Sequence, residues 1–116
     1  MIKNAGILGL GALGGMYGNF LTKAIGRENV YILGDRERLE RYRDKSVYIN
    51  GEKADFNYAF ESTKLDLLIV ATKFHHLRKA LESAKAFVTE NTIVISLLNG
   101  ITSEEVIAEV LRKGRS

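Results

Sequence analysis

Three glycines with the spacing G-x-G-x-x-G, at Gly9, Gly11 and Gly14, constrain this 116-residue chain more than any other feature. A short apolar run, residues 5–8, precedes them as a buried strand would, and a helical pattern follows. In such a strand–turn–helix unit the first glycine permits a tight turn, the second lets a pyrophosphate approach the backbone, and the third lets helix and strand pack closely. The sequence therefore predicts a turn whose helix N-terminus faces phosphate groups.

The helix after the turn is expected to be amphipathic. One face carries its apolar side chains, namely Leu13, Tyr17, Phe20, Leu21 and Ala24. Glycines also fall within this helix, at Gly14, Gly15 and Gly18. Each of them costs about 0.5–1 kcal/mol relative to alanine. Close approach of a ligand and of a neighbouring strand would account for that cost.

Two other interpretations of the glycine-rich segment are open: a cluster of turn glycines without a ligand, and a signal peptide or membrane anchor. The second arises because no charged residue lies between Lys3 and Lys23, but the many glycines, two asparagines and the lack of a cleavage site argue against it. Against the first, an acidic residue, Asp35, follows Gly14 by 21 positions at the end of a second apolar run.

The amino-acid composition limits which classes of protein the chain can belong to. With 46% hydrophobic and 27% charged residues, residues 1–116 are expected to form a single globular domain. The glycine motif predicts that this domain binds a dinucleotide. The chain has no cysteine, which excludes disulfides, thiolate metal sites and a cysteine nucleophile, and fits a cytoplasmic location. A formal charge of +3 is too small to favour nucleic acid as a partner.

Asp35 and Arg36 follow the second predicted strand, residues 30–33, where a Rossmann unit meets the adenosine ribose. A carboxylate there accepts a hydrogen bond from the 2′-hydroxyl of NAD, whereas a nearby arginine accommodates the 2′-phosphate of NADP. If NADP binds, Asp35 must turn away while Arg36 or Arg38 engages the phosphate. The residues alone leave both cofactors open.

Between residues 47 and 60 the pattern predicts a β-hairpin excursion in place of the usual third helix. Asn50-Gly51 separates two extended runs, which is a strong short-range hairpin signal. Tyr58 and Phe60 then alternate with small or polar residues, so the chain is expected to return to the sheet.

Two further apolar runs, residues 65–71 and 92–98, predict strands, and the first is expected to be a parallel strand covered on both faces. The first ends at Thr72-Lys73 and the second at Asn99-Gly100. Ligands of open α/β sheets bind beyond the carboxyl ends of the strands, so these residues are expected at the same edge as the glycine turn. A loop lysine and a plain turn are the structural alternatives.

Other features favour structure over chemistry. His75 and His76 are adjacent and have no third ligand at suitable spacing, so a solvated helix start is favoured over a metal site. Thr102 and Glu105 form a capping box for a last helix. The fold class predicted is α/β, a Rossmann-type mostly parallel sheet with helices on both faces.

The chain resembles the amino-terminal domain of ketopantoate reductase (2-dehydropantoate 2-reductase). The matching pieces follow the family's order along nearly the whole chain: residues 9–14, 69–73 and 98–101, followed by Glu104-Glu105. The resemblance implies a reductase that passes a hydride from NADPH to the carbonyl of a 2-oxo acid, ketopantoate, in pantothenate and coenzyme A biosynthesis.

The resemblance also implies site residues. The cofactor-binding set it predicts, together with the residues argued above, is Gly9, Leu10, Gly11, Ala12, Leu13, Gly14, Asp35, Arg36, Thr72, Lys73 and Asn99. Asn99 is expected to reach the substrate as well, and Arg36 is the match for the arginine that contacts the 2′-phosphate. Asp35 beside Arg36 departs from the family pattern.

The family has a second, helical domain that carries the catalytic lysine and grips the substrate, and we expect that domain to be absent from this chain. No catalytic residue is therefore predicted here, and any homodimer would form through the second domain. Alternatives are the domain of a sibling dehydrogenase with another substrate, a non-catalytic NAD(H)-sensing module, and a methyltransferase-like domain.

Overall fold

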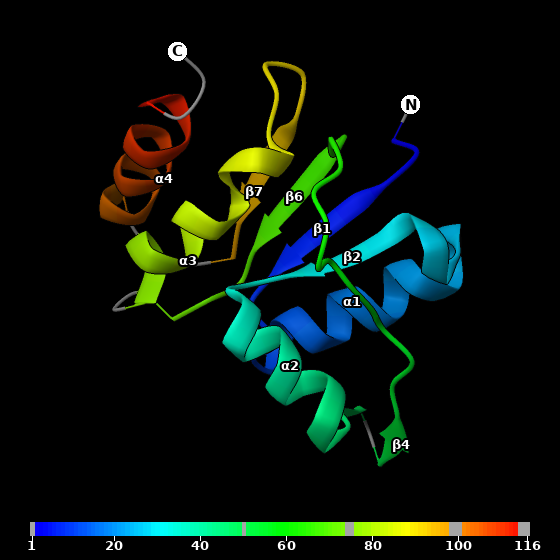
Figure 1. The fold of residues 1–116 in the computed structure, drawn as a ribbon. Coiled ribbons are helices and arrows are strands. Elements are labelled where there is room, and N and C mark those ends of the chain that lie inside the picture. The colour runs from blue at the N-terminus through cyan, green and yellow to red at the C-terminus, as the bar shows by residue number, and fades with distance from the viewer. Residues whose placement is uncertain (1, 50, 74–75, 98–100, 114–116) are drawn as a thin grey trace.

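A computed structural model describes residues 2–49, 51–73, 76–97 and 101–113 (Figure 1). Within this part of the chain, five parallel strands form one sheet in the order β5-β2-β1-β6-β7. The strands are β1 (Ala5–Leu8), β2 (Val30–Leu33), β5 (Asn57–Tyr58), β6 (Leu67–Val70) and β7 (Ile93–Ser96). The expected Rossmann-type parallel sheet is confirmed.

The register aligns the carboxyl ends of the central strands. Leu8, the last residue of β1, lies opposite Leu33 of β2 and Val70 of β6, and Val70 lies opposite Ser96 of β7. Every residue of β1 and β6 is buried, because both faces of the sheet are covered there. The loops that leave β1, β2 and β6 therefore begin side by side at one edge (Figure 1).

Helices cover both faces of the sheet. In the described residues these are α1 (Ala12–Ile25), α2 (Arg36–Lys45), α3 (Leu77–Ala84) and α4 (Ile101–Lys113), with short 3₁₀ turns η1 (Arg27–Asn29) and η3 (Lys85–Phe87). One core joins Leu8, Leu68 and Val70 to α3 and α4, and the other joins Ile7 and Ile69 to side chains of α1 and α2. Alternate residues of each strand thus point to opposite helix layers.

The predicted β excursion is confirmed. β3 (Tyr48–Ile49) and β4 (Glu52–Lys53) form a small antiparallel pair, and Gly51 between them has a positive φ of 81°. Asn50 of the same turn lies outside the described residues. The chain then returns to the sheet as β5, in which Asn57 lies opposite Tyr31 of β2.

Helix α1 forms as predicted, but most of the large side chains of its apolar stripe do not face the sheet. Leu13, Tyr17 and Phe20 are 52%, 43% and 66% exposed, and Met16 beside them is 56% exposed. Glycines form much of the buried face instead, at Gly14, Gly15 and Gly18. The large side chains at the start of this face are therefore exposed, whereas Leu21 farther along it is partly buried and packs against the core.

Close packing explains this orientation. A β-carbon on Gly18 would lie 3.3 Å from the Phe56 ring and 3.5 Å from Cδ1 of Ile32, and one on Gly15 would lie 2.7 Å from Cδ1 of Ile49. The start of the helix lies so near the sheet and the hairpin that a side chain at Gly15 or Gly18 would crowd these neighbours, whereas Leu21 and Ile25 farther along pack on the core. None of the described helices is both long and apolar enough to cross a membrane.

Candidate functional site

The glycine turn, Gly9 to Gly14, joins β1 to α1 and packs directly on the end of β6. Gly9 has a φ of +100°, a conformation that residues with a side chain rarely adopt. A β-carbon on Gly9 would lie 2.7 Å from the backbone nitrogen of Thr72 and 2.8 Å from its Cα. Glycine at this position is therefore required both by the backbone conformation and by the neighbouring chain.

The third glycine of the motif closes the turn. A β-carbon on Gly14 would overlap the carbonyl oxygen of Gly9 and lie 3.1 Å from Cβ of Ala71. The second glycine has no such restriction, since a β-carbon on Gly11 would meet only the Ala71 carbonyl oxygen, at 3.9 Å. Packing thus explains Gly9 and Gly14, whereas the protein itself leaves space at Gly11.

Helix α1 begins without a cap from its own chain. Its N-cap residue is Gly11, no side chain bonds to the first turn, and that turn contains no acidic residue. The first N–H groups of a helix have no partner within the helix, and the helix dipole makes this end partly positive. The start of α1 is therefore suited to an anionic group that approaches Gly11.

Two neighbouring cavities lie at this edge of the sheet. One of about 110 Å³ is lined by Leu8, Gly9, Leu33, Gly34, Asp35, Arg38, Thr72, His76, Lys79 and Ala80. The other, of about 220 Å³, is lined by Gly9, Leu10, Gly11, Arg38, Tyr42, Ala71, Thr72, Lys73 and His76. They share Gly9, Arg38, Thr72 and His76, so the glycine turn, the start of α2 and the end of β6 form one continuous region.

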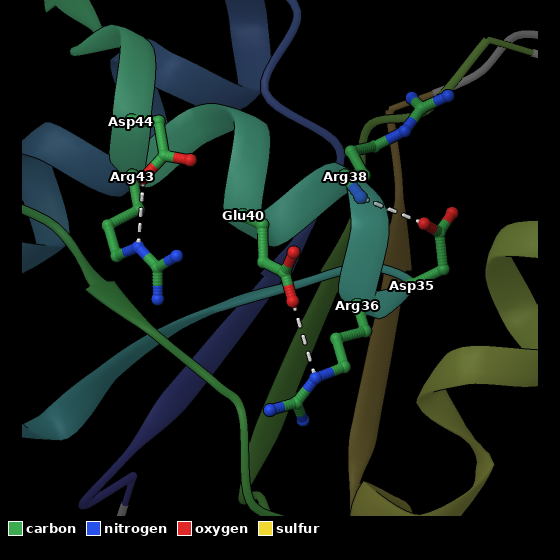
Figure 2. A network of polar contacts seen from close by, with 6 residues as sticks. All are labelled: Asp35, Arg36, Arg38, Glu40, Arg43 and Asp44. Atoms are coloured by element: carbon green, nitrogen blue, oxygen red, sulfur yellow. Dashed lines mark hydrogen bonds and ion pairs between the residues drawn. The ribbon is translucent and has the colours of Figure 1, made fainter.

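Asp35 begins α2 and lines the smaller of these cavities. Its backbone is extended, and its Oδ1 accepts a hydrogen bond from the backbone N–H of Arg38 at 2.9 Å (Figure 2). This is the side-chain geometry of a helix N-cap, which satisfies one of the unpaired donors of the first turn. The carboxylate is thus held beside the glycine turn by the helix that it caps.

The structure does not bring Arg36 to the glycine turn. Its Nε forms an ion pair with Glu40 at 3.4 Å, and its guanidinium carbon lies 5.5 Å from the centre of the Phe60 ring. Arg36 instead lines a separate cavity together with Phe60. Figure 2 shows Arg36 and Asp35 directed to different sides of α2, with Arg38 on the side of Asp35.

The end of β6 contributes the other predicted side chains. Thr72 is only 5% exposed, and Lys73, which is exposed, lines the larger of the two neighbouring cavities. Asn99 and His75 lie outside the described residues, so their predicted positions are not placed. Among the described residues, no group of three or more metal-binding side chains gathers.

The cavities include residues that the sequence interpretation missed. Arg38 was considered only as a substitute for Arg36, His76 was interpreted as part of a solvated helix start, and Tyr42 and Lys79 were not considered as site residues. Helical spacing could have identified them, because Arg38 lies three positions after Asp35, and Lys79 three after His76. The start of α3 thus adds basic groups to the edge already formed by β1, β2 and β6.

Larger cavities lie elsewhere and contain no part of the glycine turn. One of about 310 Å³ lies between β7 and α4, with Val94, Ser96 and Ile107 in its wall. Another, of about 360 Å³, lies beside the hairpin and includes Arg27 and Tyr58. Neither is lined by a residue of the glycine turn, so size alone does not identify the site.

Comparison with known proteins gives a consistent result. The family model described as ketopantoate reductase PanE/ApbA matches residues 5–116. A 2-dehydropantoate 2-reductase of Pyrococcus abyssi is 36% identical over 109 residues, which cover 89% of this chain and 35% of that protein. The chain therefore spans about a third of the length of such relatives.

Solved structures show the same fold. An Enterococcus faecalis protein provisionally assigned as a 2-dehydropantoate 2-reductase is 26% identical, with a TM-score of 0.72 over 92% of this chain and 37% of that one. A D-mandelate dehydrogenase in complex with NADH is 27% identical, with a TM-score of 0.72 over 93% of this chain and 35% of that one.

Proposed function

This chain belongs to the ketopantoate reductase family, and we propose that it is the nicotinamide-dinucleotide-binding domain of an oxidoreductase that acts on a 2-oxo acid. The observation that carries this proposal is the start of α1. There, an uncapped helix N-terminus follows Gly11, at which the protein leaves space for a side chain. A pyrophosphate that approaches this backbone would accept hydrogen bonds from the first-turn N–H groups.

The remaining groups of the site fit the rest of a dinucleotide. The pyrophosphate would lie on the glycine turn, Gly9 to Gly14, and the adenosine ribose would lie near Asp35, at the end of β2. Lys73 and Thr72, at the end of β6, would lie toward the nicotinamide. When bound, the nicotinamide ring supplies or accepts the hydride.

The relatives support a proposal for the substrate class. One acts on 2-dehydropantoate, and another is a dehydrogenase of D-mandelate. Both substrates carry a carboxylate next to the carbon that changes between a carbonyl and a hydroxyl group. We therefore propose a small 2-oxo acid as substrate, with ketopantoate and its place in coenzyme A biosynthesis as the leading candidate and a sibling 2-oxo acid as the alternative.

Catalysis is proposed to need a further domain. Reduction of a ketone requires a proton donor at the developing alkoxide and a group that holds the substrate carboxylate. We assign neither role to this chain, which spans about a third of the relatives' length, and place both in a second, helical domain. Incubation of the 116-residue chain with NADH or NADPH and ketopantoate should give no turnover, and measurable turnover would contradict this assignment.

Binding to the chain is the direct test of the proposal. Titration calorimetry with NADH and with NADPH should show 1:1 binding of at least one of them. Gly11→Ser should keep the fold, since serine is a favoured N-cap and the nearest atom to a β-carbon there is 3.9 Å away. The same variant should weaken binding at least tenfold, because the new side chain lies where the pyrophosphate approaches.

Lysine substitutions test the other end of the site. Lys73→Ala should weaken dinucleotide binding, whereas Lys23→Ala, which removes the same charge at the far end of α1, should not. Failure of both dinucleotides to bind a folded chain would overturn the proposed function. Binding of S-adenosylmethionine instead would favour the methyltransferase-like alternative.

A further inference from the structure

We infer that this site selects NAD(H) over NADP(H), and that Asp35 is the residue that decides the choice. The inference rests on the proposed function and adds to it the chemistry of the adenosine end of the cofactor. It departs from the NADPH dependence that the family resemblance implies. Three observations carry it: the fixed position of the Asp35 carboxylate, the position of Arg36, and the placement of Arg38.

The Asp35 carboxylate is anchored where a ribose would lie. One of its oxygens, Oδ1, accepts the hydrogen bond from the Arg38 backbone, and the side chain lines the same cavity as Gly9 and Gly34. To turn away from a bound ribose, Asp35 would have to release the N-cap of α2. The other carboxylate oxygen is left to accept a hydrogen bond, which the 2′-hydroxyl of NAD can donate and a 2′-phosphate cannot.

Charge reinforces this geometry. A 2′-phosphate beside Asp35 would place like charges next to each other in a partly buried cavity, where their repulsion is stronger than in bulk water. No ion pair joins the described side chains of Asp35 and Arg38, and Figure 2 shows the Arg38 guanidinium directed away from the carboxylate. None of the ion pairs identified among the described residues therefore offsets the Asp35 carboxylate at this cavity.

The arginine expected to offset that charge is held elsewhere. Arg36 is paired with Glu40 and lies over Phe60, in the wall of a different cavity. The basic side chains that do line the cavity with Asp35 are Arg38, His76 and Lys79. Arg38 is therefore the group that would bind a 2′-phosphate if Asp35 did not exclude it. The inference can thus be tested by substituting either Asp35 or Arg38.

The decisive variant is Asp35→Asn. Asparagine caps a helix about as well as aspartate does, so the fold and the position of the side chain are retained while the charge is removed. The wild-type chain should bind NADH at least tenfold more tightly than NADPH. In Asp35→Asn the affinity for NADPH should rise tenfold or more, while the affinity for NADH falls only a few-fold. Added salt should reduce the preference of the wild-type chain for NADH over NADPH.

The matched control is Glu37→Gln, which removes a negative charge from the same first turn of α2 at an exposed position that lines neither cavity. It should leave both affinities unchanged. A second pair of variants compares Arg38→Gln with Arg41→Gln. Arg41 is exposed farther along the same helix.

The outcomes separate the inference from the proposed function. Tighter binding of NADPH by the wild-type chain, lost in Arg38→Gln but not in Arg41→Gln, would overturn the inference and leave the proposed function standing. Equal rises in NADPH affinity for Asp35→Asn and Glu37→Gln would also overturn it, because the effect would then be one of net charge. Failure of both cofactors to bind would overturn the proposed function and the inference with it.

Discussion

The carbonyl oxygen of Gly9 occupies the space into which a side chain on Gly14 would project. The two glycines lie at opposite ends of the turn between β1 and α1, and the turn can close only because neither carries a β-carbon. Gly9 packs against the backbone of Thr72, and Gly14 packs against Gly9. The first and third glycines of the G-x-G-x-x-G spacing are thus packing requirements of this fold before any ligand is considered, whereas Gly11 is not.

Gly14→Ala should therefore destabilise the chain. Alanine favours a helix by about 1 kcal/mol over glycine, but the overlap with the Gly9 carbonyl involves backbone, which cannot move aside cheaply. We expect a net loss of about 1–3 kcal/mol in the free energy of unfolding, which is typical of overpacked sites. Urea denaturation measures it. Gly11→Ser serves as the control and should stay within about 0.5 kcal/mol of the wild type.

The exposed stripe of α1 allows a second prediction. Phe20 is 66% exposed and Phe56 is 3% exposed, although both are phenylalanines on the same side of the sheet. Phe20→Ser should change the free energy of unfolding by no more than about 0.5 kcal/mol, whereas Phe56→Ala should cost about 3–5 kcal/mol. Similar losses for both variants would show that the stripe is buried in solution, for example against a second copy of the chain.

The stability of the fold should depend on pH through Tyr58. Burial in β5 raises the pKa of the Tyr58 phenol above its ordinary value of 10.0, and the neighbouring Tyr42 and Asp55 raise that pKa further. The unfolded chain ionises this phenol at a lower pH than the folded chain does. The contribution of Tyr58 to stability is therefore fully present below about pH 10 and is lost as the pH rises through the folded pKa.

A difference between variants isolates this effect from the titration of other groups. The free energy of unfolding of the wild type should fall more steeply above pH 10 than that of Tyr58→Phe, and the two curves should be parallel near neutral pH. Tyr48→Phe, whose parent side chain is 63% exposed, should follow the wild type throughout. Parallel curves for Tyr58→Phe and the wild type above pH 10 would contradict the assignment.

Local patterns were enough to predict most of the elements. β-branched and apolar runs predicted the central strands, and Asn50-Gly51 predicted the hairpin, because strand formation and tight turns depend on residues that are neighbours in sequence. The glycine spacing likewise predicted a strand–turn–helix unit. The same local information assigned Thr72 and Lys73 to the end of a strand, and both line a cavity with Gly9.

What the sequence by itself determined, then, is the order of strands and helices, the glycine turn and the edge at which the strand ends gather. The tertiary structure decided which face of α1 is buried, because a β-carbon at Gly15 or Gly18 would crowd Ile49, Ile32 or Phe56. It also decided that Arg38 rather than Arg36 lies with Asp35. Neighbouring residues on a helix point about 100° apart. Which of them faces the site therefore depends on how α2 packs against the sheet, and their adjacency in sequence does not determine this packing.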